Sequence, residues 1–194
     1  GLPLVLVDQD PVDGVPCVNV DDRAGARAAA QHLIDLGHRR LVALTLAVEG
    51  TSPAAEPHAR LYAHPQRQRY LGWLDAAESA GASLEVLEVV GHDDRAAADA
   101  IAPLLAGSDR PTAVLCFSDL FAVGVVRAAR DVGLEVPRDL SVVGYDDSPI
   151  AERVEPPLTT VHQDVAAKGV EAASALRGAM GDLDVSPRHV MLPT

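Results

Sequence analysis

Polar side chains follow several apolar runs of the sequence, at points where buried strands would end. They are Asp8, His92, Asp93, Ser118 and Asp146. Because ligands of open parallel sheets bind beyond the carboxyl ends of the strands, we expect these side chains to share one rim. Arg69, near the start of an expected helix, can reach the same rim. Hydrogen-bond acceptors together with a guanidinium suit a polyhydroxylated ligand such as a sugar.

Two acidic residues near this rim have an equally good structural role. Asp94 and Asp119 each stand immediately before a helical pattern. A carboxylate at that position can cap the first turn of the helix. Asp146 differs, because Asp147 and Ser148 could cap whatever follows it. We therefore favour Asp146 over the other two as a ligand contact.

Signatures of catalysis or metal binding are poor. The sequence has no G-x-S-x-G turn, no G-x-x-x-x-G-K-[ST] loop, and no G-x-G-x-x-G at a helix start. His58 and His64 come nearest to a metal pair, but they lack helical spacing and carboxylate support. We interpret them as solvated histidines of a loop. No catalytic residue, metal site or cofactor is expected, and the chain is not expected to be an enzyme.

The composition narrows the class of protein further. Of the 194 residues 48% are hydrophobic, which is enough for a real core, and the formal charge of −12 would repel DNA. No apolar stretch approaches the roughly 20 residues needed to cross a bilayer. Cys17 and Cys116 fit no metal spacing, and Cys116 lies in an apolar run. We expect a cytoplasmic protein with no membrane partner.

Short apolar runs alternate with helical patterns along the chain. The runs are nearly continuous in Val, Leu and Ala, as in strands covered on both faces, and span residues 4–7, 41–46, 86–90, 113–117 and 141–145. The helical patterns span residues 23–36, 68–80, 95–106, 120–132 and 165–179. This alternation predicts an α/β fold with a doubly wound parallel sheet. Residues 47–66 break the rhythm and are expected to form a long loop.

Five stretches together resemble the lactose-repressor (LacI/GalR) family of transcription regulators. Residues 31–40 (QHLIDLGHRR) are similar to a helix-to-strand junction of the family, and residues 69–73 (RYLGW) to one of its helix starts. Residues 118–124 (SDLFAVG) are similar to its N-D-x-x-A-x-G stretch. The most specific are residues 136–147 (VPRDLSVVGYDD), followed by residues 156–161 (PPLTTV). The resemblance covers nearly the whole chain.

The resemblance implies a periplasmic-binding-protein-like fold, with two lobes of doubly wound parallel sheet and a ligand in the cleft between them. By analogy, residues 1–37 and 164–188 would form an N-terminal lobe, which would be incomplete. Residues 38–163 and 189–194 would form the C-terminal lobe. An exposed strand edge is expected near residues 4–7, because several βα units of the family would precede them.

The resemblance also implies particular ligand contacts. They carry over to Arg69, Asp146 and Gln163. Ser118 departs from the pattern, because many relatives have Asn there. His92 and Asp93 also depart, because they stand where sugar-binding relatives often place an aromatic ring. These departures leave the identity of the ligand open.

The function implied by the resemblance is effector sensing within a transcriptional repressor. Such a protein is expected to form a homodimer and to bind a small sugar-like effector. Operator DNA would be bound only through an N-terminal helix-turn-helix, which this sequence lacks. A solute-binding protein for sugar transport remains an alternative, which a signal peptide upstream would favour. A sugar-processing α/β enzyme is a more distant third.

Overall fold

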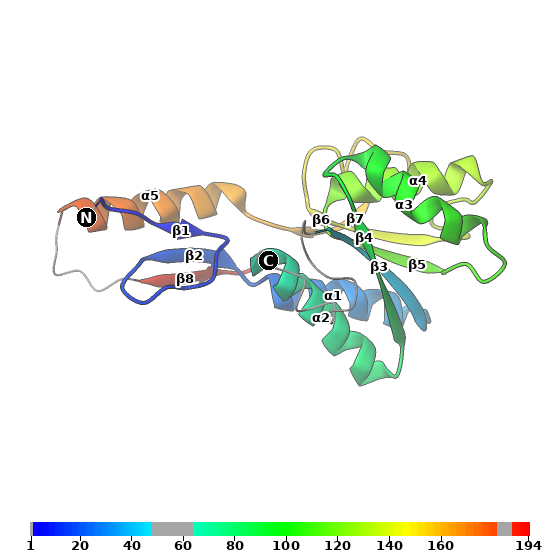
Figure 1. Ribbon diagram of the computed structural model, residues 1–194, viewed down its shortest axis with the longest axis horizontal. Helices are drawn as coiled ribbons and strands as arrows, with labels where there is room; N and C mark the ends of the chain where they lie inside the picture. Colours follow the sequence, from blue (N-terminus) through cyan, green and yellow to red (C-terminus); the bar gives the residue numbers. More distant parts are fainter. Residues whose placement is uncertain (1, 48–63, 182–187) are drawn as a thin grey trace.

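The computed structural model describes residues 2–47, 64–181 and 188–194, which form two parallel β-sheets at different ends of an elongated molecule (Figure 1). The smaller sheet has the order β1-β2-β8, with β1 (Leu6–Val7), β2 (Cys17–Val20) and β8 (His189–Leu192). The larger sheet has the order β4-β3-β5-β6-β7, with β3 (Arg40–Leu46), β4 (Ser83–Val89), β5 (Ala113–Cys116), β6 (Ser141–Asp146) and β7 (Thr159–His162). Every pair is parallel. The predicted two-lobed α/β fold is confirmed.

Helices cover both faces of the larger sheet, and we call this body the C-terminal lobe (Figure 1). One face carries α1 (Asp22–Asp35) and α2 (His64–Ala80), and the other carries α3 (Asp94–Ala106) and α4 (Asp119–Asp131). All four residues of β5 are buried, as expected for a strand between two helical layers. The continuous apolar runs of the sequence therefore reflect burial on both sides of the sheet.

Side-chain caps fix where the helices of the C-terminal lobe begin. Asp93 accepts a hydrogen bond from the backbone N–H of Ala96, and Ser118 accepts one from that of Phe121. These two residues are the N-caps, whereas Asp94 and Asp119 occupy the first helical turn. The sequence interpretation of Asp94 and Asp119 as caps was therefore wrong by one residue.

The smaller sheet and α5 (Val165–Gly181) form the second body, which we call the N-terminal lobe. In it α5 packs against β2, the central strand, whose four residues are all buried. At the edge of the sheet lies β1, and Val7 of this strand and Leu4 just before it are exposed. The exposed strand edge expected near residues 4–7 is therefore present.

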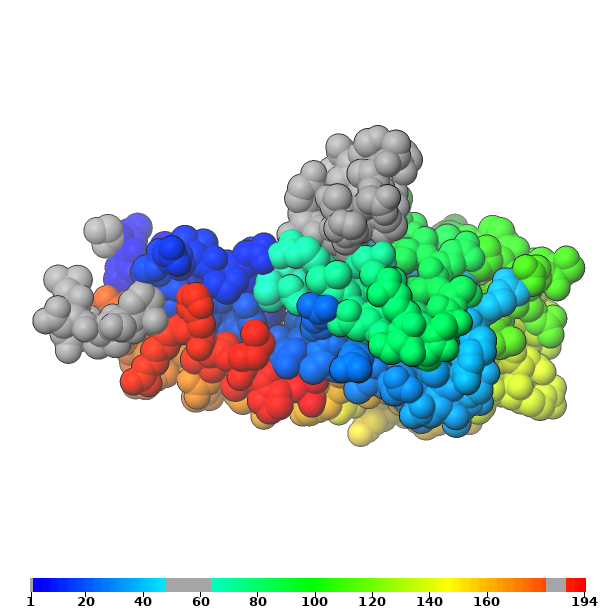
Figure 2. Space-filling model, turned by 90° about the horizontal axis from the view of Figure 1, so that it is seen from below, coloured from blue at the N-terminus to red at the C-terminus, as the bar shows by residue number. Residues whose placement is uncertain are grey.

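The strand pairing alters the expected division into lobes in two places. Residues 189–192 were expected in the C-terminal lobe, but β8 pairs with β2, and the C-terminal segment lies beside the N-terminal strands (Figure 2). Helix α1 was expected in the N-terminal lobe, but it packs against α2 and buries its apolar stripe on the larger sheet. Gly72 permits this packing, because a Cβ there would collide with the backbone of α1.

Most of the expected long loop, residues 48–63 with His58, lies outside the described residues. Its last part differs from the prediction, because residues 64–66 form the first turn of α2. Cys116 is free and buried, as its apolar run predicts; Cys17 is free and buried too, and burial raises the pKa of both thiols. Within the described ranges no helix is long and apolar enough to cross a membrane.

Candidate functional site

A cavity of about 640 Å³ lies where the two lobes meet. The C-terminal lobe contributes side chains from α2 and from the carboxyl ends of β5 and β6, and the N-terminal lobe contributes side chains from β1 and α5. Its polar lining residues are Asp8, Arg69, His92, Ser118, Asp146, Gln163 and Lys168. Its volume falls within the range of small-molecule sites. The cavity is therefore large enough for a ligand of one or two sugar rings.

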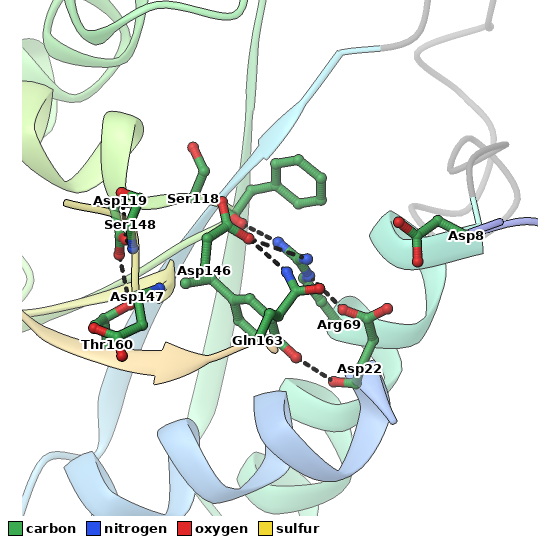
Figure 3. A network of polar contacts seen from close by, with 12 residues as sticks. Asp8, Asp22, Arg69, Ser118, Asp119, Asp146, Asp147, Ser148, Thr160 and Gln163 are labelled. Carbon is green, nitrogen blue, oxygen red and sulfur yellow. Dashed lines mark hydrogen bonds and ion pairs between the residues drawn. The ribbon is translucent and has the colours of Figure 1, made fainter. Parts of the chain in front are cut away.

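Arg69, on α2, is the central cation of this cavity, and only 4% of it is exposed. Its Nε donates to Asp22 at 2.8 Å, and its Nη1 donates to the carbonyl oxygen of Phe117. The guanidinium carbon lies 3.6 Å from the ring centroid of Tyr145 and 4.6 Å from that of Phe117, which permits cation–π attraction. These contacts hold the guanidinium in one orientation toward the cavity (Figure 3).

Asp146 places a carboxylate opposite Arg69. Its Oδ1 lies 3.4 Å from Arg69 Nη2 and accepts a 2.6 Å hydrogen bond from Nε2 of Gln163 (Figure 3). The residue has a φ of 108°, a backbone conformation that few residues other than glycine adopt. Burial raises the pKa of Asp146, and the positive charge of Arg69 opposes that rise. Because Asp146 lines the cavity, its carboxyl oxygens are placed to accept hydrogen bonds from the hydroxyl groups of a ligand.

Gln163 connects the carboxylate of one lobe with a lysine of the other. It lies between β7 and α5, where the chain passes between the lobes. Its Oε1 accepts a 3.0 Å hydrogen bond from Nζ of Lys168, on α5. Lys168 also pairs with both carboxylate oxygens of Asp8, at 2.8 and 3.0 Å. A chain of polar contacts thus runs from Asp8 to Arg69 across the boundary of the lobes.

The other predicted site residues have mixed outcomes. Ser118 lines the cavity, although its hydroxyl also caps α4. His92 lines it as well and forms edge contacts with Phe117 and Phe121, so an imidazole occupies part of the apolar wall. Asp93 is not among the lining residues, because its carboxylate caps α3. Of the six predicted contacts, Asp93 is the one that the structure does not bring to the cavity.

Buried Asp119 supports the site from behind. It accepts hydrogen bonds from the backbone N–H and hydroxyl of Ser148, at 2.7 and 2.8 Å, and from the hydroxyl of Thr160 at 2.5 Å (Figure 3). These contacts join the turn after β6 to β7 and so fix the backbone that presents Asp146. Asp119 is not among the residues that line the cavity, and its hydrogen bonds position the turn that carries Asp146.

Three charged groups of the site were not predicted from the sequence as ligand contacts. Asp8 was placed on the rim but not among the ligand contacts, and Lys168 and Asp22 were not considered. Lys168 is the only lysine of the chain, and this rarity was the signal that could have singled it out. Asp22 is 1% exposed, and burial raises its pKa while Arg69 opposes the rise. Nothing in the sequence around Asp22 distinguishes it from a helix cap.

His64 lies in a second contact between the lobes and is not a solvated loop histidine as predicted. It is 8% exposed in the first turn of α2, and its Nδ1 lies 2.9 Å from Oδ1 of Asp10. Its Nε2 lies 3.5 Å from the amide nitrogen of Asn19 on β2, and Arg67 pairs with the same Asp10.

Within the described ranges no group of three or more His, Cys, Asp or Glu side chains could hold a metal ion.

Comparison with known proteins agrees with this architecture. Residues 30–194 match the family of periplasmic binding protein-like domains. The chain is 38% identical over 188 residues to the HTH-type transcriptional regulator MalR of Streptomyces coelicolor, covering 93% of this chain and 50% of that protein. The chain thus spans about half the length of this curated relative.

Solved structures show the same fold. A regulatory protein of the LacI family from Chloroflexus aggregans superposes with a TM-score of 0.83 at 28% identity, over 98% of this chain and 65% of that one. A LacI family transcriptional regulator from Arthrobacter, in complex with lactose, gives 0.83 at 25% identity, over 98% and 68%. The chain therefore belongs to the periplasmic binding protein-like family, and its relatives include LacI-family regulators.

Proposed function

We propose that this chain is the effector-sensing module of a transcriptional repressor, and that the cavity between its lobes binds a small hydroxylated ligand such as a sugar. The observation that carries the proposal is the convergence of Arg69, Asp146 and Gln163 on one cavity between the lobes. Carboxylate and amide oxygens accept hydrogen bonds from hydroxyl groups, and a guanidinium donates to them. The lactose bound by the Arthrobacter regulator is a ligand of this chemistry.

The site also suggests how binding would be transmitted. Gln163 lies where the chain passes between the lobes, and it contacts Asp146 of one lobe and Lys168 of the other. A ligand that takes over one of these contacts changes the relative stability of the lobe arrangements. The resulting shift can be no larger than the difference in ligand affinity between those arrangements. In a homodimer, that shift would re-space DNA-binding domains outside this chain.

We infer that the protein is a cytoplasmic regulator rather than an enzyme or a transport protein. The relative MalR is named a transcriptional regulator, which favours regulation over solute transport. DNA contact is assigned to another part of the protein, because a chain with a formal charge of −12 repels phosphates. A gel-retardation assay with operator DNA should show no binding by this chain alone at physiological salt.

A thermal-shift screen tests the proposal directly. A panel of neutral mono- and disaccharides, nucleosides and amino acids is added to the protein, and we expect at least one neutral sugar to raise the melting temperature. Asp146→Asn should lower the affinity for that sugar by at least roughly tenfold, because the substitution replaces a charged hydrogen-bond acceptor. Asp93→Asn is the matched control, since Asn also caps helices and Asp93 is not a lining residue. Equal loss in both variants would show that Asp146 has no special role.

A further inference from the structure

Lys168 is the only lysine of the 194 residues, and it is buried in the wall of the cavity. Its Nζ lies 2.8 and 3.0 Å from the two carboxylate oxygens of Asp8 and 3.0 Å from Oε1 of Gln163. An ammonium group has three N–H donors and no acceptor. The two carboxylate oxygens of Asp8 lie on one side of Nζ, so Asp8 and Gln163 together engage the ammonium group and Asp8 neutralises its charge.

The second cation of the cavity is engaged in the same way. Arg69 pairs with Asp22 and lies 3.4 Å from Asp146. Three carboxylates, those two and Asp8, therefore face two cations among the described residues of the site. The charge of Asp119, behind β6, further opposes ionisation of Asp146. An anionic ligand would enter a partly buried site that already has an excess of negative charge, where repulsion is much stronger than in water.

We propose that the Asp8–Lys168 pair is a charge filter, which restricts the cavity to neutral hydroxylated ligands and excludes uronic acids and sugar phosphates. Asp8 occupies the ammonium group that an anion would need, and its own half-buried carboxylate stays within reach of ligand hydroxyls. Lys168 in turn neutralises Asp8 and orients the amide of Gln163 toward Asp146. That the ligand is hydroxylated rests on the proposed function. That it carries no negative charge rests on the contacts of Asp8 and Lys168 alone.

Matched pairs of probes isolate the charge of the ligand. Glucose and glucuronate, like galactose and galacturonate, differ by one hydroxymethyl group that becomes a carboxylate. The wild-type chain should bind each acid at least roughly tenfold more weakly than the corresponding neutral sugar that binds. Asp8→Asn frees the ammonium group of Lys168 and should reduce this discrimination by roughly tenfold. Lys168→Met makes the cavity more negative and should increase the discrimination.

Asp99→Asn is the control for a change in net charge, because it removes an exposed carboxylate from α3. It should leave the discrimination at its wild-type value. Calorimetric titration gives the affinities, and thermal unfolding establishes that each variant is folded. If Asp8→Asn does not fold, the proposal is tested by Lys168→Met, which should increase the discrimination against acidic sugars. Acids that bind the wild type as tightly as the neutral sugars would overturn the filter.

A second readout does not depend on any sugar. Lysine labelled with ¹³C at Cε gives a single side-chain NMR signal from this chain, because Lys168 is the only lysine. Inorganic phosphate should leave that signal in place in the wild type and shift it in Asp8→Asn. Equal shifts in both proteins would contradict the filter. If this difference is present but no neutral sugar binds, the proposed ligand class is wrong and the filter stands.

Discussion

The central strands of the two lobes are equally buried, but their surroundings differ. In the C-terminal lobe β5 lies within five strands and between two layers of helices. In the N-terminal lobe β2 lies within three strands, and the described helix that packs on it is α5. Large exposed apolar side chains are more numerous there; they include Leu4, Val12, Val165, Val170 and Met191. Within this chain we therefore expect the N-terminal lobe to be less stable than the C-terminal lobe.

The largest expected effect comes from the charged core of the C-terminal lobe. Arg69→Met should lower the free energy of unfolding by about 3–5 kcal/mol, because it leaves the buried Asp22 without its cation. Urea denaturation measures this change. Arg127→Met is the matched control, since its ion pair with Asp94 is half exposed and should contribute below about 1 kcal/mol. Similar losses in both variants would show that burial of the Arg69 pair has no energetic consequence.

A matched pair of valines compares the lobes themselves. Val114 on β5 and Val18 on β2 are both 0% exposed at the centre of their sheets. Val114→Ala should cost about 2–3 kcal/mol because helices and strands surround it, and Val18→Ala about 1 kcal/mol. Hydrogen exchange should likewise be faster for the amides of β2 than for those of β5. Equal costs and equal exchange would remove the distinction between the lobes.

Much of the fold was predictable, because parallel sheets buried on both faces leave a clear signal. The runs that became β3 and β5 are nearly continuous in Val, Leu and Ala, and the interior of β6 is buried as well. In the N-terminal lobe the run at residues 4–7 became β1, but β2 and β8 were not predicted, because both are short, Asn19 interrupts the apolar run of β2, and the exposure of β8 alternates. β8 pairs with β2 although the two strands lie near opposite ends of the sequence, and no local sequence pattern indicates such a partner.

The site was predictable where it follows strand ends and unpredictable where it depends on packing. Asp146 and Ser118 stand directly at or after strands, so the rule for parallel sheets located them. Lys168 reaches the cavity from the first turns of α5, and its role depends on Asp8, 160 residues away in sequence. The burial of His64 likewise depends on Asn19 and Asp10 of the other lobe.

The smallest expected effects concern pH, and they have opposite signs at the two contacts between the lobes. Hydrogen bonds from His64 and Arg67 lower the pKa of Asp10 below its ordinary 3.8. Its contribution to stability is therefore complete above pH 3.8 and is lost as the pH falls through the lowered value. Asp10→Asn should reduce the acid sensitivity of unfolding slightly, because the residue is largely exposed.

Burial instead raises the pKa of Asp146 above 3.8, so its ionised form costs stability as the pH rises through the raised value. A ligand that needs this carboxylate should consequently bind more weakly at acid pH, beginning above pH 3.8. Carboxyl ¹³C titration by NMR measures both groups in one experiment. If Asp10 titrated above Asp146, the electrostatic contrast between the two contacts would be wrong.

The most direct test of the ligand site is a crystal structure of the chain with a neutral sugar that raises its melting temperature. We expect the sugar between the lobes, with hydroxyl groups about 3 Å from the carboxylate of Asp146 and the guanidinium of Arg69. Gln163 should either contact the sugar or no longer donate its hydrogen bond to Asp146. A sugar bound elsewhere on the protein, with these three side chains arranged as they are now, would contradict the account.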